Sequence, residues 1–249
     1  MNSILTLLII FVVALFLFLW PKRLAQQEEL PPLRPLQAYA ALKGQVGRAI
    51  ESAQQLHVTL GRASLTGTAN PTSVAALAVL DKLAAEGCAS DTPPITTVGD
   101  ATLLPLAENN LRHAAAQSRS KAGIPTGTAR FIASKEDPFA YAAGVASVFQ
   151  QENVLGSVMV GQFGQELAIM TDAAGRNQVQ QVIGSDDPLA LAVALPLTDN
   201  LMIGEEMLAA PAYVSGKAEQ IASLQLQDAA RLLISLILLA FALFNLFAG

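Results

Sequence analysis

Every Lys and Arg residue of this chain lies between two apolar segments, one near each end of the sequence. The first segment runs from Ile4 to Trp20 and the second from Leu232 to about Phe247, and all 15 basic residues fall between them. The segments hold about 17 and 16 residues, close to the ~20 that a helix needs to cross a ~30 Å hydrocarbon core. This arrangement predicts a transmembrane helix at each end of the chain, with the middle part on one side of the bilayer.

The residues that flank the first segment argue against a cleaved signal peptide. Such a peptide has positive charge before its apolar run and small residues at a cleavage site after it. Here Met1–Ser3 contains no basic residue, and Pro21-Lys22-Arg23 follows the run. We therefore expect a two-pass protein of a cell inner membrane or plasma membrane. Because basic residues near the spans favour the cytoplasmic side, both termini should lie outside and the main domain in the cytoplasm.

Composition restricts the function of the middle part. Hydrophobic residues make up 52% of the chain and charged residues 14%, which predicts one well-buried core. The net charge of -5 and the lack of a Lys/Arg cluster argue against nucleic-acid binding. The single Cys88 cannot form an internal disulfide, which fits a reducing compartment. Two histidines and one cysteine without ligand spacing predict no metal site.

Four regions follow from these patterns. Residues 1–20 form the first transmembrane helix, and residues 21–35 form a linker, because its four prolines exclude regular structure. Residues 36–216 form the folded domain. Residues 217–249 begin as a juxtamembrane helix that continues into the second span.

Strand-like and helix-like patterns alternate through the folded domain. A helix is expected over residues 36–55. Further helices are expected over residues 70–85, 101–117, 138–151, 187–195, 203–210 and from about 215 onward. Strands are expected over residues 56–60, 95–98, 131–133, 154–160, 166–170 and 178–183, with residues 161–164 as a possible hairpin turn. This alternation predicts an α/β domain with a mostly parallel sheet flanked by helices, in Rossmann-like layers.

Several polar turns follow the expected strands. In open α/β sheets, ligands sit beyond the carboxyl ends of the strands, where loop amides and helix N-termini point. The alternative is that Asp100, Asp172 and Asp187 only cap helices. If the turns converge, they form a small-ligand site, and its candidate residues are Ser64, Thr66, Gly67, Asp100, Thr171, Asp172 and Ser185.

No motif of a known reaction is present, so no catalytic residue and no cofactor are assigned. The stretch Gly161–Gly164 lacks the third glycine of a dinucleotide fingerprint, and no Gly-Lys-Ser/Thr sequence occurs. No Gly-x-Ser-x-Gly elbow supports a pairing of His57 with Ser64. The pair Glu205-Glu206 is typical of the first turn of a helix. Both His57 and Cys88 are expected to be structural.

Seven short stretches of the folded domain are similar to one known family. They are Leu56–Gly61, Ser64–Gly67, Val98–Asp100, Pro138–Gly144, Val160–Gly164, Thr171–Ala174 and Ile203–Glu206. Over roughly residues 36–216 the chain resembles an uncharacterised family of bacterial membrane proteins, described as a domain of unknown function. The resemblance implies a membrane-associated bacterial domain and supplies no activity, substrate or site residue.

Three hypotheses of function remain. The first is a non-enzymatic domain, anchored in the lipid bilayer, that forms homo-oligomers or acts as a scaffold at the cytoplasmic membrane face. The second is a sensor or binding domain for an unidentified small ligand at the strand ends. The third is a hydrolase that uses Ser64 or Cys88 as nucleophile.

Overall fold

The computed structural model describes residues 32–65, 71–118 and 123–248. The chain divides into two units. We call Pro35–Val214 the globular unit; the terminal unit comprises Met1–Arg34 and Ser215–Gly249.

Six parallel strands form one sheet in the globular unit, in the order β3-β2-β1-β4-β5-β6. Their bounds are β1 Gln55–Gly61, β2 Ile95–Val98, β3 Ala129–Phe131, β4 Val154–Gln162, β5 Gln180–Ser185 and β6 Leu201–Ile203. The chain starts in the middle of the sheet, proceeds outward to β3, and then returns to place β4 on the other side of β1. This is the strand order of doubly wound dinucleotide-binding folds, which reverses between β1 and β4. The predicted α/β class with a mostly parallel sheet is confirmed.

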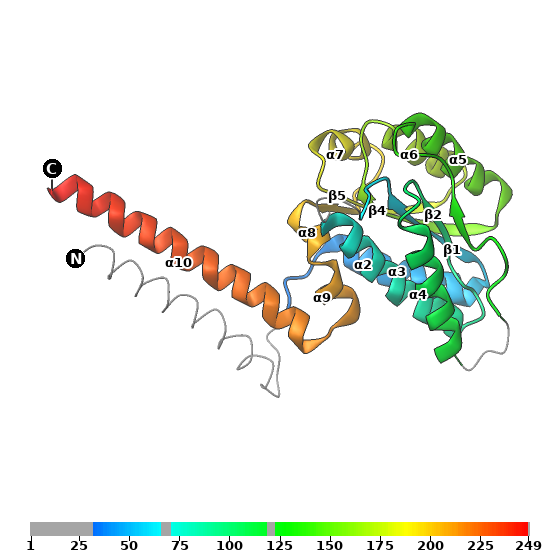
Figure 1. Cartoon of the computed structure of the whole chain (residues 1–249), viewed down its shortest axis with the longest axis horizontal. Helices are drawn as coiled ribbons and strands as arrows, with labels where there is room; N and C mark the ends of the chain where they lie inside the picture. The colour runs from blue at the N-terminus through cyan, green and yellow to red at the C-terminus, as the bar shows by residue number, and fades with distance from the viewer. Residues whose placement is uncertain (1–31, 66–70, 119–122, 249) are drawn as a thin grey trace. The chain divides into compact units, whose positions relative to one another are not determined.

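Helices cover both faces of the sheet (Figure 1). On one face lie α5 (Pro138–Gln151), α6 (Leu167–Arg176) and α7 (Pro188–Ala194). On the other face lie α2 (Gln37–Ser52), α3 (Pro71–Ala89) and α4 (Leu104–Gln117). The short helices α8 (Glu205–Leu208) and α9 (Ala210–Ser215) follow β6.

The sheet separates two apolar cores. Alternate residues of β1 point to opposite faces, as the two-residue period of a strand requires. Leu56, Val58 and Leu60 pack into the core beneath α2 and α3. The core beneath α5, α6 and α7 contains Tyr141, Phe149, Met159, Phe163 and Met170. Burial on both faces explains why β4 reads as a mostly apolar run.

Two Asp-Pro pairs begin helices as predicted. The Asp187 carboxylate accepts a hydrogen bond from the Leu189 amide at 2.7 Å, at the start of α7. The Asp137 carboxylate accepts one from the Ala140 amide at 3.5 Å, at the start of α5. In each case proline occupies the first helical position, where its missing N–H removes no helical hydrogen bond.

The predicted strand over residues 166–170 and the hairpin before it are wrong. Residues 163–166 instead connect β4 to helix α6, which begins at Leu167. The buried residues of α6 are Leu167, Met170, Thr171 and Ala174. They recur at the three- and four-residue spacing of a helix, but the first of them form too short an apolar run to show that period.

Other boundaries also differ from expectation. Helix α3 continues to Ala89, so Gly87 does not end it. A Cβ at Gly87 would lie 2.6 Å from the Thr92 carbonyl oxygen, which leaves room only for glycine. The helix expected over residues 203–210 is preceded by the strand β6, and α8 and α9 follow as two separate turns.

The two ends of the globular unit lie side by side. Tyr39, in the first turn of α2, stacks on Tyr213 of α9, with ring centroids 4.4 Å apart and ring planes 6° from parallel. The Tyr39 hydroxyl also donates a hydrogen bond to the Glu206 carbonyl at 2.6 Å. The chain therefore enters and leaves the globular unit at neighbouring points.

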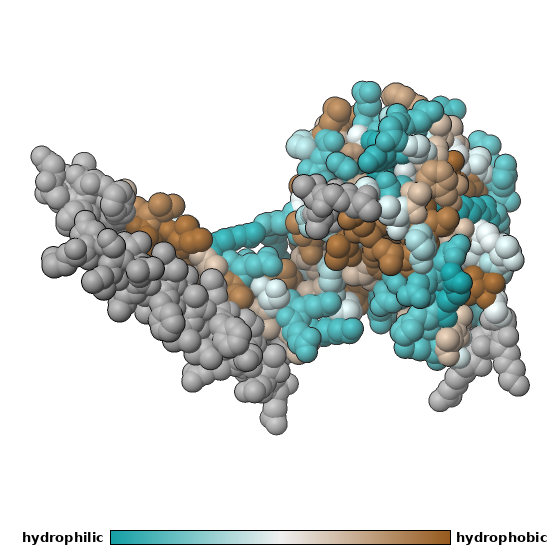
Figure 2. All heavy atoms as spheres, viewed as in Figure 1, coloured by the Kyte–Doolittle hydropathy of each residue, from teal (hydrophilic) through white to brown (hydrophobic). Residues whose placement is uncertain are grey.

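The terminal unit contains the helix α10 (Ala218–Ala248). Its part Ala218–Leu239 is long and apolar enough to cross a membrane, and it is the one such helix in the described residues. Figure 2 shows that the described surface of α10 changes from hydrophilic to hydrophobic along the helix. The predicted first span, residues 1–20, lies outside the described residues.

Candidate functional site

The ends of β1 and β4 meet at the point where the strand order reverses. Two glycines allow this contact, because a Cβ at Gly61 would lie 2.7 Å from the backbone of Gln162, and a Cβ at Gly161 would lie 2.3 Å from the Leu60 carbonyl oxygen. The Arg62 amide then donates to the Gln162 carbonyl at 3.1 Å. Beyond this contact the chain turns to α3 on one face and to α6 on the other.

A buried ion pair joins the two turns. Nε of Arg62 donates to Oε1 of Glu166 at 2.7 Å, and the two side chains are 18% and 2% exposed. The same carboxylate oxygen accepts the Gly164 amide at 2.9 Å, and Nη1 of Arg62 donates to the Lys135 carbonyl at 2.7 Å. Glu166 and Lys135 thus fix the guanidinium from two different loops.

A second polar cluster ties the end of β2 to the turn after β1. Oδ1 of Asp100 accepts hydrogen bonds from the Thr102 amide at 2.9 Å and from its hydroxyl at 2.5 Å. The Thr102 hydroxyl oxygen in turn accepts the Leu65 amide at 3.2 Å and lies 3.5 Å from the Ser64 hydroxyl. A Cβ at Gly99 would lie 2.7 Å from Cγ of Arg62, so the Arg62 stem passes directly over the residue before Asp100. We call Arg62, Glu166, Ser64, Asp100 and Thr102 the strand-end cluster.

A network of buried polar groups lies along the strands that carry the cluster. The two ring nitrogens of His57 lie 2.8 Å from the Ser157 hydroxyl and 2.9 Å from the Thr97 hydroxyl. Burial, aided by the charge of Arg130, lowers the pKa of His57 to about 3. His57 is therefore neutral near pH 7 and buried from solvent, so its role is structural.

Tyr141 connects this network to the strand-end cluster. Its hydroxyl shares a hydrogen bond with the hydroxyl of Thr59, and its ring would lie 3.2 Å from a Cβ at Gly99. Burial raises the pKa of Tyr141 to about 12, so the phenol stays protonated. The network holds β1, β2, β4 and α5 together beneath the cluster.

Comparison with protein families identifies the chain. The model of one family, the domain of unknown function DUF6754, matches residues 1–248. The chain belongs to this family. No significant match to a curated protein or to a solved structure was found. The resemblance to a domain of unknown function is therefore confirmed, and it extends beyond residues 36–216 to residues 1–248.

The structure brings together two of the predicted site residues. Ser64 and Asp100 meet through the Thr102 hydroxyl. Thr66 and Gly67 lie outside the described residues. Ser185 ends β5, and its hydroxyl oxygen accepts the Asp187 amide at 3.2 Å, within the turn before α7.

Thr171 and Asp172 do not lie in a strand-end turn, because they belong to the second turn of α6. The Thr171 hydroxyl donates to the Leu167 carbonyl at 2.9 Å, and Asp172 forms an exposed ion pair with Arg176 at 2.8 Å. The alternative prediction, that these aspartates only cap helices, is correct for Asp187. Asp100 similarly accepts a backbone amide in the turn before α4. Asp172 lies inside α6 and does not cap it.

Arg62, Glu166 and Thr102 were not predicted as site residues. Arg62 directly follows β1, as Ser64 nearly does. Its position at the end of a strand could therefore have marked it as a site residue. Glu166 was missed because residues 166–170 were predicted as a strand, and a residue within a strand does not lie in a strand-end turn.

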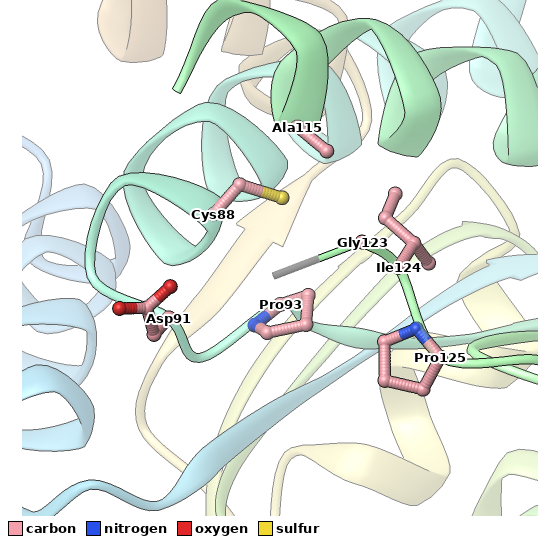
Figure 3. Close-up of a pocket in the computed structure, with 7 residues that line it drawn as sticks. All are labelled: Cys88, Asp91, Pro93, Ala115, Gly123, Ile124 and Pro125. Atoms are coloured by element: carbon pink, nitrogen blue, oxygen red, sulfur yellow. The ribbon is translucent and has the colours of Figure 1, made fainter. Parts of the chain in front are cut away.

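A small cavity lies at the opposite edge of the sheet, where α3 and α4 end. It has a volume of about 80 Å³ and is lined by Cys88, Asp91, Pro93, Ala115, Gly123, Ile124 and Pro125 (Figure 3). This is well below the roughly 300–1,000 Å³ of ordinary ligand pockets. Burial raises the pKa of the Cys88 thiol, which disfavours the nucleophilic thiolate. Within the described residues, no three His, Cys, Asp or Glu side chains gather as a metal site requires.

Proposed function

We propose that this protein is a membrane-anchored binding module that holds a small polar ligand at the strand-end cluster. The observation that carries the proposal is the position of Arg62 and Glu166 at the reversal of strand order between β1 and β4. Open α/β sheets bind their ligands at this place, because the turns there lead to opposite faces and expose amides and side chains.

The energetics of the ion pair favour a role in binding over a role in folding alone. A buried ion pair adds little stability relative to apolar side chains of similar volume, since desolvation offsets the attraction between the charges. The 2% exposed Glu166 is nevertheless fixed by an amide and a guanidinium. Preorganised charged groups of this kind are suited to orient a polar ligand.

Thermal-shift screening of the full-length chain in detergent tests the proposal. Nucleosides, nucleotides, sugars, amino acids and other metabolites would be compared. A ligand at 100 times its dissociation constant adds about 2.7 kcal/mol to the free energy of unfolding. Arg62→Gln should abolish the shift, whereas Arg112→Gln, on the exposed face of α4, should retain it. Absence of any stabilising compound, or an equal shift in Arg62→Gln, would refute the proposal.

The proposal includes a two-pass topology, with residues 1–20 as the first span, both termini outside and the globular unit in the cytoplasm. The Tyr39–Tyr213 stack supports it, because the chain enters and leaves the globular unit at neighbouring points. Protease added to sealed, right-side-out cells should leave the globular unit intact. Digestion of that unit in sealed cells would contradict the topology.

Self-assembly as a scaffold is a second candidate function, and exposed apolar residues favour it. Five helices that follow a strand each expose a large apolar side chain within their first four residues. These residues are Val74, Leu106, Phe139, Ile169 and Leu189. In a parallel sheet all these helix starts lie at one edge, so the apolar side chains gather there.

Light scattering after size-exclusion chromatography in detergent tests self-assembly. The same edge carries Asp137, Asp187 and Glu205, so copies that meet there repel each other at low salt. We expect an oligomer that strengthens between about 50 and 300 mM salt, with Phe139→Ser weakening it. A strict monomer at micromolar concentration under both conditions would exclude this candidate.

A further inference from the structure

We infer that the ligand of the strand-end cluster is a small zwitterion of the amino-acid class, with its carboxylate on Arg62 and its ammonium group on Asp100. The inference rests on the proposed function, since it names the chemical class that the same site accepts. It follows from the hydrogen-bonding capacity that the protein leaves unused on these two side chains.

Arg62 has one amino group to spare. Nε is used by Glu166 and Nη1 by the Lys135 carbonyl, and within the described residues Nη2 donates no hydrogen bond to the protein. The guanidinium is planar, so holding two of its nitrogens also fixes the direction in which the third donates. Because arginine is always charged, its remaining N–H groups are suited to an anionic oxygen such as a carboxylate.

Asp100 has one carboxylate oxygen to spare. Oδ1 accepts both hydrogen bonds from Thr102, and within the part of the chain that is described Oδ2 accepts none. The residue is 9% exposed. A carboxylate oxygen can only accept hydrogen bonds, so its partner must be a donor, and an ammonium group gives the strongest such bond.

Arg62 and Asp100 follow neighbouring strands, β1 and β2, and do not pair with each other. The stem of Arg62 passes over Gly99, the residue before Asp100, yet the described ion pairs include none between Arg62 and Asp100. A small ligand that carries an ammonium group and a carboxylate on the same carbon atom can bridge the two side chains. Such a ligand satisfies both side chains without leaving a charge of its own unpaired.

The net charge of the strand-end cluster favours a zwitterion over a nucleotide. Glu166 already neutralises Arg62, and Asp100 adds one further negative charge to the cluster. A polyphosphate would place several negative charges beside two carboxylates, which is unfavourable at short range. A zwitterion of zero net charge meets no such repulsion.

Isothermal titration calorimetry of the full-length chain in detergent tests the inference with the twenty common L-amino acids as probes. For the amino acid that binds best, two analogues follow: the amine without its carboxylate and the acid without its ammonium group. Each analogue should bind about 10- to 100-fold more weakly, as loss of a hydrogen bond between charged groups predicts.

One conservative variant assigns the ammonium position. Asp100→Asn can still accept the Thr102 amide through its carbonyl oxygen, so the turn is retained. It should weaken the amino acid about 10- to 100-fold and leave the acid analogue unchanged. Asp172→Asn, on the exposed face of α6, serves as the matched control and should bind as the wild type does.

The outcomes separate the inference from the proposed function. If nucleosides, nucleotides or sugars bind in an Arg62-dependent way and amino acids do not, the zwitterion is wrong and the proposed function stands. If an amino acid binds equally well to Asp100→Asn, the inference is likewise overturned. If no compound of any class binds, both fail.

Discussion

Replacing Glu166 by alanine should lower the free energy of unfolding of the globular unit by about 3 kcal/mol. The substitution leaves the guanidinium of Arg62, which is 18% exposed, without its counter-charge, and it leaves the Gly164 amide without its acceptor. Removing one partner of a buried ion pair is much more destabilising than the pair is stabilising, because the remaining charge stays desolvated. Urea denaturation of the detergent-solubilised chain, followed by circular dichroism, measures the change.

Two controls isolate the buried charge. Glu166→Gln retains an acceptor for the amide and should lose about half as much stability as Glu166→Ala. Glu108→Gln breaks the exposed ion pair with Arg112 on α4 and should change stability by less than about 0.5 kcal/mol. A loss below 1 kcal/mol in Glu166→Ala would show that the Arg62–Glu166 pair is not desolvated as the structure implies.

The stability of the globular unit should also fall as the pH drops from about 6.5 toward 3, because of His57. Burial lowers the pKa of His57 from 6.5 to about 3 in the folded chain, whereas the unfolded chain keeps the ordinary value. Between these values the unfolded state binds a proton that the folded state does not, so stability rises with pH there. The contribution is complete above about pH 6.5, and at pH 4.5 about 3 kcal/mol of it is lost.

A difference measurement separates His57 from the carboxylates that also titrate at low pH. The stability gap between wild type and His57→Gln should shrink by about 3 kcal/mol from pH 7.5 to pH 4.5. His113→Gln, at an exposed position on α4, should show no such change in its gap. If His57→Gln does not fold, the imidazole resonances of the wild type serve instead. Their titration above pH 5 would contradict the buried, neutral histidine.

Much of the fold follows from local sequence. The strand Ile95–Val98 lies where it was predicted, because a short β-branched run between turn residues favours a buried strand. The Asp-Pro pairs at residues 137–138 and 187–188 begin α5 and α7 for reasons confined to a few neighbouring residues. Helix α6 was mistaken for a strand over residues 166–170, because five residues are too few to distinguish a period of two from one of 3.6.

The site was only partly predictable, for a different reason. Ser64 and Asp100 were placed together because parallel strands end at one edge of the sheet, whichever strands are neighbours. The pairing of Arg62 with Glu166 needs β4 beside β1, and these two residues are 104 positions apart in the chain. Strand order is set by how the two cores pack, and no local pattern encodes it.

Amide hydrogen exchange of the full-length chain, with and without the compound that stabilises it most, tests the binding of a ligand at the strand-end cluster most directly. We expect slower exchange in three peptides that together cover residues 61–65, 99–103 and 163–167. Exchange in α4 beyond Leu111 and around Cys88 should not change. Protection confined to the cavity beside Cys88, or no local protection at all, would contradict the central claim.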